Sequence, residues 1–120
     1  MFRIPLLIGA LIAAALLLAA PSTSMGVKKL QGSVGPGFTI SLKKSGAKVR
    51  TLPAGKYSIT VIDKSKLHDF HLKGPGLSVV ITKTPFVGVK TITVTLKKGK
   101  TYKYVCDPHA ASMHGSFRVT

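Results

Sequence analysis

The 120-residue sequence has no glutamate and only three acidic residues, Asp63, Asp69 and Asp107. It has a single cysteine, Cys106, so no disulfide can form within the chain. In an exported protein, an unpaired cysteine is a reactive thiol, half of an intermolecular disulfide or a protected metal ligand. No segment after residue 25 has a sustained helical periodicity, which argues against a helical domain. The sequence therefore lacks both disulfide staples and long helices.

The shortage of acidic residues leaves the chain strongly basic. Of its 18 Lys and Arg only Arg3 precedes residue 25, so residues 25–120 carry 17 basic against three acidic side chains, a net charge of +14. Such a field favours acidic redox partner proteins or an anionic membrane surface. The basic residues are scattered and not clustered, as on the solvated faces of strands. We do not expect nucleic acid as a ligand, because Tyr57, Tyr102 and Tyr104 share the parity of core positions and do not alternate with Lys on an exposed face.

The first 24 residues have the pattern of a signal peptide. Arg3 precedes Ile4–Ala20, a run of almost only Leu, Ile and Ala, and small residues follow. An uncleaved membrane anchor is the alternative, because a run of 17 apolar residues is at the lower limit for crossing a bilayer. We expect an exported protein, periplasmic or extracellular, whose single domain occupies residues 25–120.

The pattern in this domain has period two, interrupted by glycine and proline, and predicts strands and turns. Apolar residues alternate with polar ones over residues 38–42, 57–61, 91–96, 102–104 and 117–119, and Gly/Pro turn signals stand at 35–37, 53–55, 74–76 and 98–100. Residues 22–34 are interpreted as a linker that runs into the first strand. Many short strands at regular spacing predict an all-β, Greek-key β-sandwich, which we expect to be monomeric.

The most informative segment brings a thiol, an imidazole and a thioether together within eight residues: Cys106, His109 and Met113. Cys106 ends a predicted strand, and Pro108 stops the strand so that the chain can loop back. A thiolate and imidazoles with a weak thioether are the ligands of mononuclear electron-transfer copper sites. We weigh His114 as a replacement for Met113 and favour Met113.

A copper site of this kind needs a second histidine, and the segment 67–73 offers His68 and His71. Side chains alternate between the two faces of a strand, and Phe70 and Leu72 are its apolar set. His68 shares their parity, whereas His71 goes with Asp69 and Lys73 toward solvent. We therefore select His68.

The pattern Tyr104-x-Cys106-x-Pro108-His109-x-x-x-Met113, with an upstream His68-Asp69-Phe70, resembles the plastocyanin, pseudoazurin and amicyanin branch of the cupredoxins. That resemblance implies one type 1 (blue) copper ion held by His68, Cys106 and His109, with Met113 as the axial ligand. It also implies that the imidazole edge of His109 passes electrons to partners. The sequence departs from the family at Asp69, where these proteins usually carry asparagine. A carboxylate accepts hydrogen bonds but cannot donate them, and its negative charge would favour Cu(II).

These observations predict a carrier of single electrons and not an enzyme. A site with four protein ligands leaves no open position for substrate. The alternative is an extracytoplasmic copper carrier or buffer that uses the same ligands. A cysteine enzyme is disfavoured, because the sequence shows no oxyanion-hole signature and is too short for a deep cleft.

Overall fold

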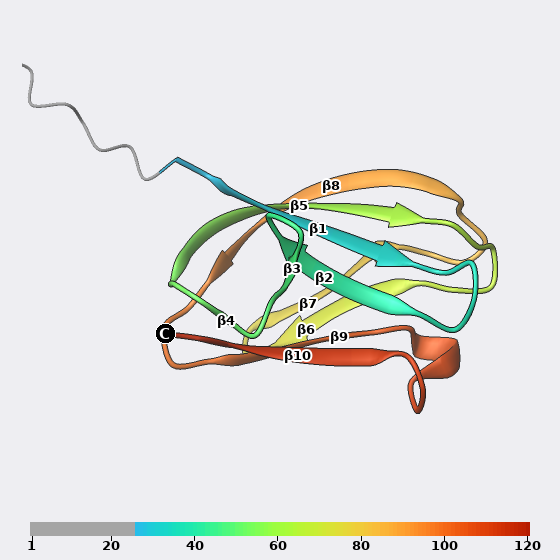
Figure 1. Cartoon of the computed structure of the whole chain (residues 1–120). Coiled ribbons are helices and arrows are strands. Elements are labelled where there is room, and N and C mark those ends of the chain that lie inside the picture. The colour runs from blue at the N-terminus through green and yellow to red at the C-terminus, as the bar shows by residue number, and fades with distance from the viewer. Residues whose placement is uncertain (1–25) are drawn as a thin grey trace, which may run out of the picture.

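The computed structural model describes residues 26–120 as ten strands in two facing sheets (Figure 1). The strands are β1 (Lys28–Val34), β2 (Ile40–Lys44), β3 (Ala47–Lys48), β4 (Thr51–Leu52), β5 (Gly55–Asp63), β6 (Phe70–Gly74), β7 (Leu77–Thr82), β8 (Gly88–Leu96), β9 (Thr101–Val105) and β10 (His114–Val119). A short 3-10 helix, η1 (Asp107–His109), follows β9. The predicted signal peptide, residues 1–24, lies outside the described residues. Within residues 26–120, no helix is long and apolar enough to span a membrane.

One sheet has the strand order β3-β2-β1-β5-β8 and the other β4-β10-β9-β6-β7. The pairs β1–β5 and β4–β10 are parallel, and the other pairs are antiparallel. The chain crosses from one sheet to the other after β3, β4, β5, β7 and β8. The predicted all-β sandwich is confirmed, and these crossings bring β6 next to β9 although some thirty residues separate them in the sequence.

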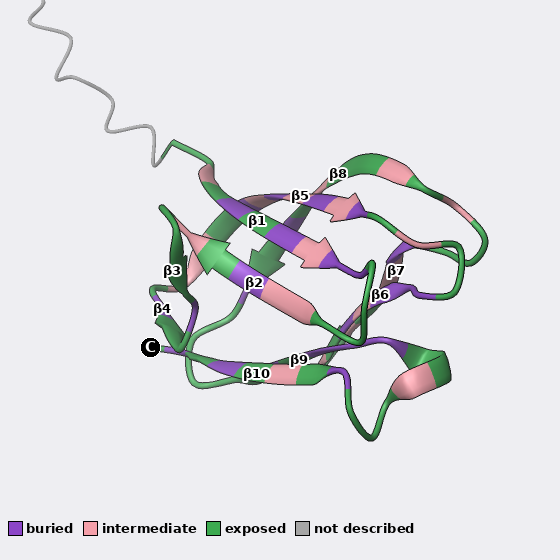
Figure 2. Ribbon diagram, turned by 45° about the vertical axis from the view of Figure 1, so that its right-hand side comes forward, coloured by how far each residue is buried: buried purple, intermediate pink, exposed green. Residues whose placement is uncertain are grey.

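The core forms where the predicted period-two positions meet between the sheets. Buried and less buried residues alternate along β5 and β9 (Figure 2). Tyr57, Tyr102 and Tyr104 are buried, as their parity predicts. Two of these phenols have hydrogen-bond partners, since Tyr57 Oη donates to the Pro53 carbonyl at 2.6 Å and Tyr102 Oη accepts from the Lys97 N–H at 3.0 Å. All four segments with turn signals lie at connections between strands.

Two local predictions are wrong. Residues 28–34, interpreted as linker, form β1, which pairs with β2 on one side and with β5 on the other. The segment is rich in polar residues and glycine, and only Leu30, Gly32 and Val34 face the core, so its sequence did not indicate a strand. Phe38, predicted as the first inward residue of a strand, instead precedes β2 and is 65% exposed. The turn at residues 35–37 extends as far as Phe38 and turns the ring away from the core.

Candidate metal centre

The sequence-predicted ligands gather at the end of the sandwich opposite the C-terminus, where η1 lies (Figure 1). β9 ends at Val105, and Cys106 is the N-cap of η1 with Pro108 in its first turn. We call residues 106–113 the ligand loop. Pro108 cannot continue a strand ladder, and its fixed φ suits the start of a helix. The chain turns at the position that the proline predicts.

Backbone hydrogen bonds within the ligand loop close it on itself. The Cys106 N–H donates to the Met113 carbonyl at 3.0 Å, and the Met113 N–H donates to the His109 carbonyl at 2.9 Å. The His109 N–H in turn donates to the Cys106 carbonyl at 3.0 Å. Three of the four predicted ligand residues are thus fixed relative to one another by the loop's own backbone.

Three donor atoms converge at this loop. His68 Nδ1 lies 3.1 Å from His109 Nδ1, and each of these nitrogens lies 3.6 Å from Cys106 Sγ. The triangle with these sides has a circumscribed circle of radius about 2.0 Å, so one point lies about 2.0 Å from all three atoms. Protein ligands bind a first-row ion such as zinc at about 2.0–2.1 Å through nitrogen and about 2.3 Å through sulfur. The cluster therefore has the dimensions of a metal site.

The chemistry of the donors fits copper. One thiolate and two imidazoles form the equatorial set of electron-transfer copper sites, whereas hard cations prefer oxygen. Cys106 and His68 are buried, and His109 is half-buried. Burial raises the pKa of the Cys106 thiol, while hydrogen bonds from the backbone N–H groups of Asp69 and His109 act in the opposite direction. A bound cation would favour the thiolate over the thiol, because metal coordination deprotonates cysteine.

The fourth predicted ligand, Met113, is 1% exposed and belongs to the buried core. Its backbone bonds to Cys106 and His109 place it at the C-terminal end of the ligand loop. His114, the weighed alternative, begins β10 and is exposed, and its Nδ1–H donates to the Ala110 carbonyl at 2.9 Å. Met113 as the axial ligand stays a prediction, which burial of the thioether favours over His114.

Asp69 connects the two segments that carry ligands. Its carboxylate accepts a 2.6 Å hydrogen bond from the Asp107 N–H. The strand parity that placed Asp69 in solvent is wrong, because β6 begins only at Phe70 and Asp69 is 7% exposed. Burial raises the pKa of Asp69. The acceptor role of this carboxylate, expected from the sequence, is confirmed by its bond to the ligand loop.

His71 is a site residue that the sequence interpretation assigned to ordinary surface. Its Nδ1 lies 2.8 Å from Asp107 Oδ2, and its Nε2 lies 2.8 Å from the Ser78 hydroxyl. Asp107 accepts a hydrogen bond from this imidazole and does not cap η1, which has no side-chain cap. Desolvation acts to raise the pKa of Asp107, but Asp69, His71 and Lys73 together lower it. Only the β6–β9 register, which puts His71 opposite Val105, could have revealed this pair.

A second loop, residues 35–39 between β1 and β2, covers the imidazoles. A Cβ atom at Gly35 would lie 3.1 Å from His68 Cδ2, so glycine lets this loop approach the ligand. The Phe38 ring packs edge-on against both imidazoles, with centroid distances of 5.7 Å to His68 and 5.0 Å to His109. We call residues 35–39 the cover loop. The sequence carried no signal for this contact.

Known copper proteins share this fold. Residues 63–120 match the model of the family "Copper binding proteins, plastocyanin/azurin family". A structure of rusticyanin is 26% identical, with 77% of this chain and 76% of that chain covered and a TM-score of 0.55. Auracyanin A, a blue copper protein from Chloroflexus aurantiacus, is 16% identical over 79% of this chain and all of its own, with a TM-score of 0.57, and shows the fold alone. No curated protein matches the chain.

A β-sandwich that brings two histidines and one cysteine to one end defines a cupredoxin-type copper protein. The matched segment begins at the end of β5 and includes His68, Cys106 and His109. Over residues 63–120, just under half of its length, the chain is similar to the plastocyanin/azurin family of copper-binding proteins, and its fold is that of the copper protein rusticyanin.

Proposed function

We propose that the protein carries single electrons between redox partners outside the cytoplasm. When bound, copper supplies a one-electron Cu(II)/Cu(I) couple. The observation that carries the proposal is the triangle of His68 Nδ1, His109 Nδ1 and Cys106 Sγ, which matches the ligand set of electron-transfer copper. With Met113 as a fourth ligand, the site has no open position for a substrate.

The two imidazoles have different tasks in this proposal. His68 is 2% exposed and anchors the site, whereas the half-buried His109 offers the only ligand edge near solvent among the three. One exposed apolar side chain stands beside it, since Phe38 is 65% exposed and packs against its ring. An exposed aromatic ring beside the solvent-facing edge of His109 suits a brief contact with a partner protein.

The positive surface of the protein supports acidic redox proteins or an anionic membrane surface as its binding partners. Every Lys and Arg among residues 26–120 is exposed or half-exposed, and Asp63 and Asp69 are buried. Complementary charge raises association rates, and salt weakens that effect. Export rests on the predicted signal peptide and on the unpaired Cys106, which copper would protect from oxidation.

The test is the visible absorption spectrum of the purified protein after addition of Cu(II), with Cys106→Ser as the control. We expect an intense thiolate-to-copper band in the native protein and none in the variant. A colourless native protein would contradict the proposal. Reversible one-electron voltammetry then separates the electron carrier from a copper-delivery protein, for which copper transfer to an apo partner is the expected activity.

A further inference from the structure

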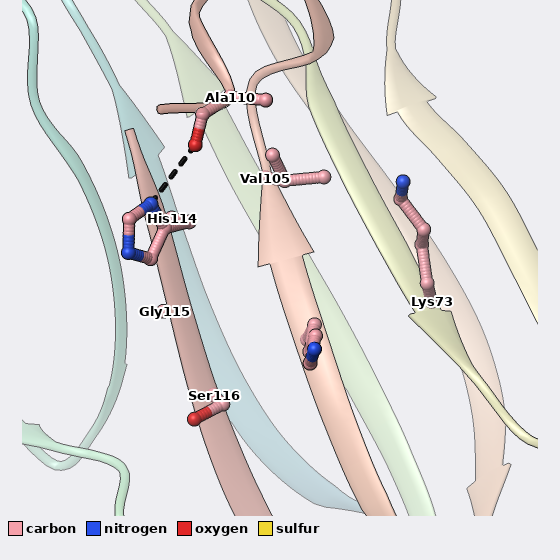
Figure 3. Close-up of a pocket in the computed structure, with 7 residues that line it drawn as sticks. Lys73, Val105, Ala110, His114, Gly115 and Ser116 are labelled. Atoms are coloured by element: carbon pink, nitrogen blue, oxygen red, sulfur yellow. Dashed lines mark hydrogen bonds between the residues drawn. The ribbon is translucent and has the colours of Figure 1, made fainter. Parts of the chain in front are cut away.

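A hollow of about 430 Å³ lies on the outer face of the sheet formed by β4, β10, β9, β6 and β7. Its polar rim consists of Lys73 from β6, Lys103 from β9, and His114 and Ser116 from β10. Figure 3 shows Lys73 on one side of the strand β9, and His114 and Ser116 on the other side. These side chains take no part in the copper cluster, whose ligand atoms belong to His68, Cys106 and His109.

The strand register forces positive charges together in this hollow. Lys73 and Lys103 are direct partners on adjacent antiparallel strands, and Lys103 is also the direct partner of Ser116. Residues directly opposite each other have Cβ atoms about 4.5–5.5 Å apart, and like charges in such pairs are destabilising. A bound anion would relieve this repulsion.

The chain has almost no carboxylate of its own for this purpose. Asp63 and Asp69 are buried, so only Asp107 remains. Its carboxylate lies 3.8 Å from Lys73 Nζ, but it also accepts the closer contact of 2.8 Å from His71. Among residues 26–120, Lys103 has no acidic side chain within ion-pair distance.

The remaining groups of the hollow suit an oxyanion. The Nδ1–H of His114 donates to the Ala110 carbonyl, which fixes the ring at the rim. The Ser116 hydroxyl is exposed and can donate to a further oxygen. Between His114 and Ser116, the half-buried Gly115 packs against the Tyr104 ring on the core side of the sheet. Two ammonium groups and a hydroxyl are donors for a sulfate, phosphate or carboxylate group.

We propose that this hollow, lined by Lys73, Lys103, His114 and Ser116, binds an oxyanion. The ligand is either a free inorganic oxyanion or the carboxylate of an acidic protein segment. The site is independent of the electron-carrier function, because it uses none of the copper ligands.

The experiment is a two-dimensional amide NMR titration of the purified copper(I) protein with sodium sulfate, compared with sodium chloride at equal ionic strength. We expect the amides of Lys103, Gly115 and Ser116 to shift saturably with sulfate, with a Kd on the order of millimolar. Lys103→Gln should weaken sulfate binding about three- to ten-fold. Lys98→Gln, which removes the same charge from an exposed turn, should change it less than two-fold, about the effect of a distant screened charge.

A parallel titration with pentaglutamate distinguishes the two sources of the oxyanion. Tighter binding of pentaglutamate than of sulfate, weakened by Lys103→Gln, assigns the hollow to an acidic protein segment. Binding of sulfate alone assigns it to a free oxyanion. If neither probe shifts these amides more than chloride does, or if Lys98→Gln weakens binding as much as Lys103→Gln, the proposal is overturned. Neither result depends on whether the copper site transfers electrons.

Discussion

The ligand loop and the cover loop both contact the two imidazoles, but they are built in different ways. The ligand loop provides Cys106 and His109 and is closed by hydrogen bonds of its own backbone. The cover loop provides no donor atom. It touches the site through the bare backbone of Gly35 and the ring of Phe38. The difference shows that a metal site can depend on residues that share neither sequence position nor chemistry with its ligands.

The sharpest test of this comparison is Gly35→Ala. Gly35 has a φ of +75°, and an added Cβ would lie 3.0 Å from Ser65 Cβ and 3.1 Å from His68 Cδ2. We expect a loss of about 2–4 kcal/mol in the free energy of unfolding, from backbone strain together with crowding. Urea unfolding measures the loss, and the thiolate-to-copper band should shift because His68 moves.

Gly46→Ala is the matched control for that prediction. Gly46 has a similar φ of +81°, but nothing lies within 4 Å of an added Cβ. Gly46→Ala should lower the free energy of unfolding only through backbone strain, by about 1–2 kcal/mol, and leave the copper spectrum unchanged. Equal losses in the two variants would show that the cover loop does not hold His68.

His71→Ala tests how far the ligand loop depends on its neighbours. The His71 imidazole is hydrogen-bonded to the Asp107 carboxylate on one side and to the Ser78 hydroxyl on the other. Removing it should cost about 1–2 kcal/mol in urea unfolding, because a partly exposed charge-assisted hydrogen bond is lost. Copper should also leave the protein faster, as measured by chelator competition. Ser78→Ala, which removes only the outer partner, should cost less and leave copper release unchanged. Equal copper release in His71→Ala and the native protein would mean that the ligand loop's own backbone bonds suffice.

Asp69→Asn tests the negative charge beside the site. An amide oxygen can still accept the Asp107 N–H, so the substitution removes charge and keeps the hydrogen bond. A carboxylate next to a ligand favours Cu(II), and its loss should raise the reduction potential by about 60 mV, equivalent to a ten-fold change in relative stability for one electron. Asp107→Asn should shift the potential less, because His71 and Lys73 already offset that charge. A potential that did not rise in Asp69→Asn would argue against this role.

These variants also separate what the sequence could predict from what it could not. Cys106, Pro108, His109 and Met113 lie within eight residues, so their chemistry is readable without knowledge of the fold. His68 followed from strand parity, because Phe70 and Leu72 mark the buried face. Such inferences depend only on local periodicity, which a sequence displays directly.

Two of the missed features depend on long-range register. Whether His71 meets Asp107 depends on the pairing of β6 with β9, which no local pattern fixes. Strand β1 was missed because its polar residues suited a linker, and only its neighbours β2 and β5 make it a strand. Phe38 was placed in the core because its alternation with Ile40 resembled a strand. The sequence cannot show where a turn ends and a strand begins.

Phe38→Ala should have the smallest effect on the comparison. The ring is 65% exposed, so its removal should cost less than about 1 kcal/mol in the free energy of unfolding. Edge-on aromatic pairs contribute about 0.5–1 kcal/mol, which corresponds to about two- to five-fold faster extraction of Cu(I) by a chelator. Val27→Ala, an exposed apolar residue before β1 at the far end of the sandwich, is the control and should leave extraction unchanged. Equal extraction rates for Phe38→Ala and the native protein would mean that the cover loop acts on the site through Gly35 alone.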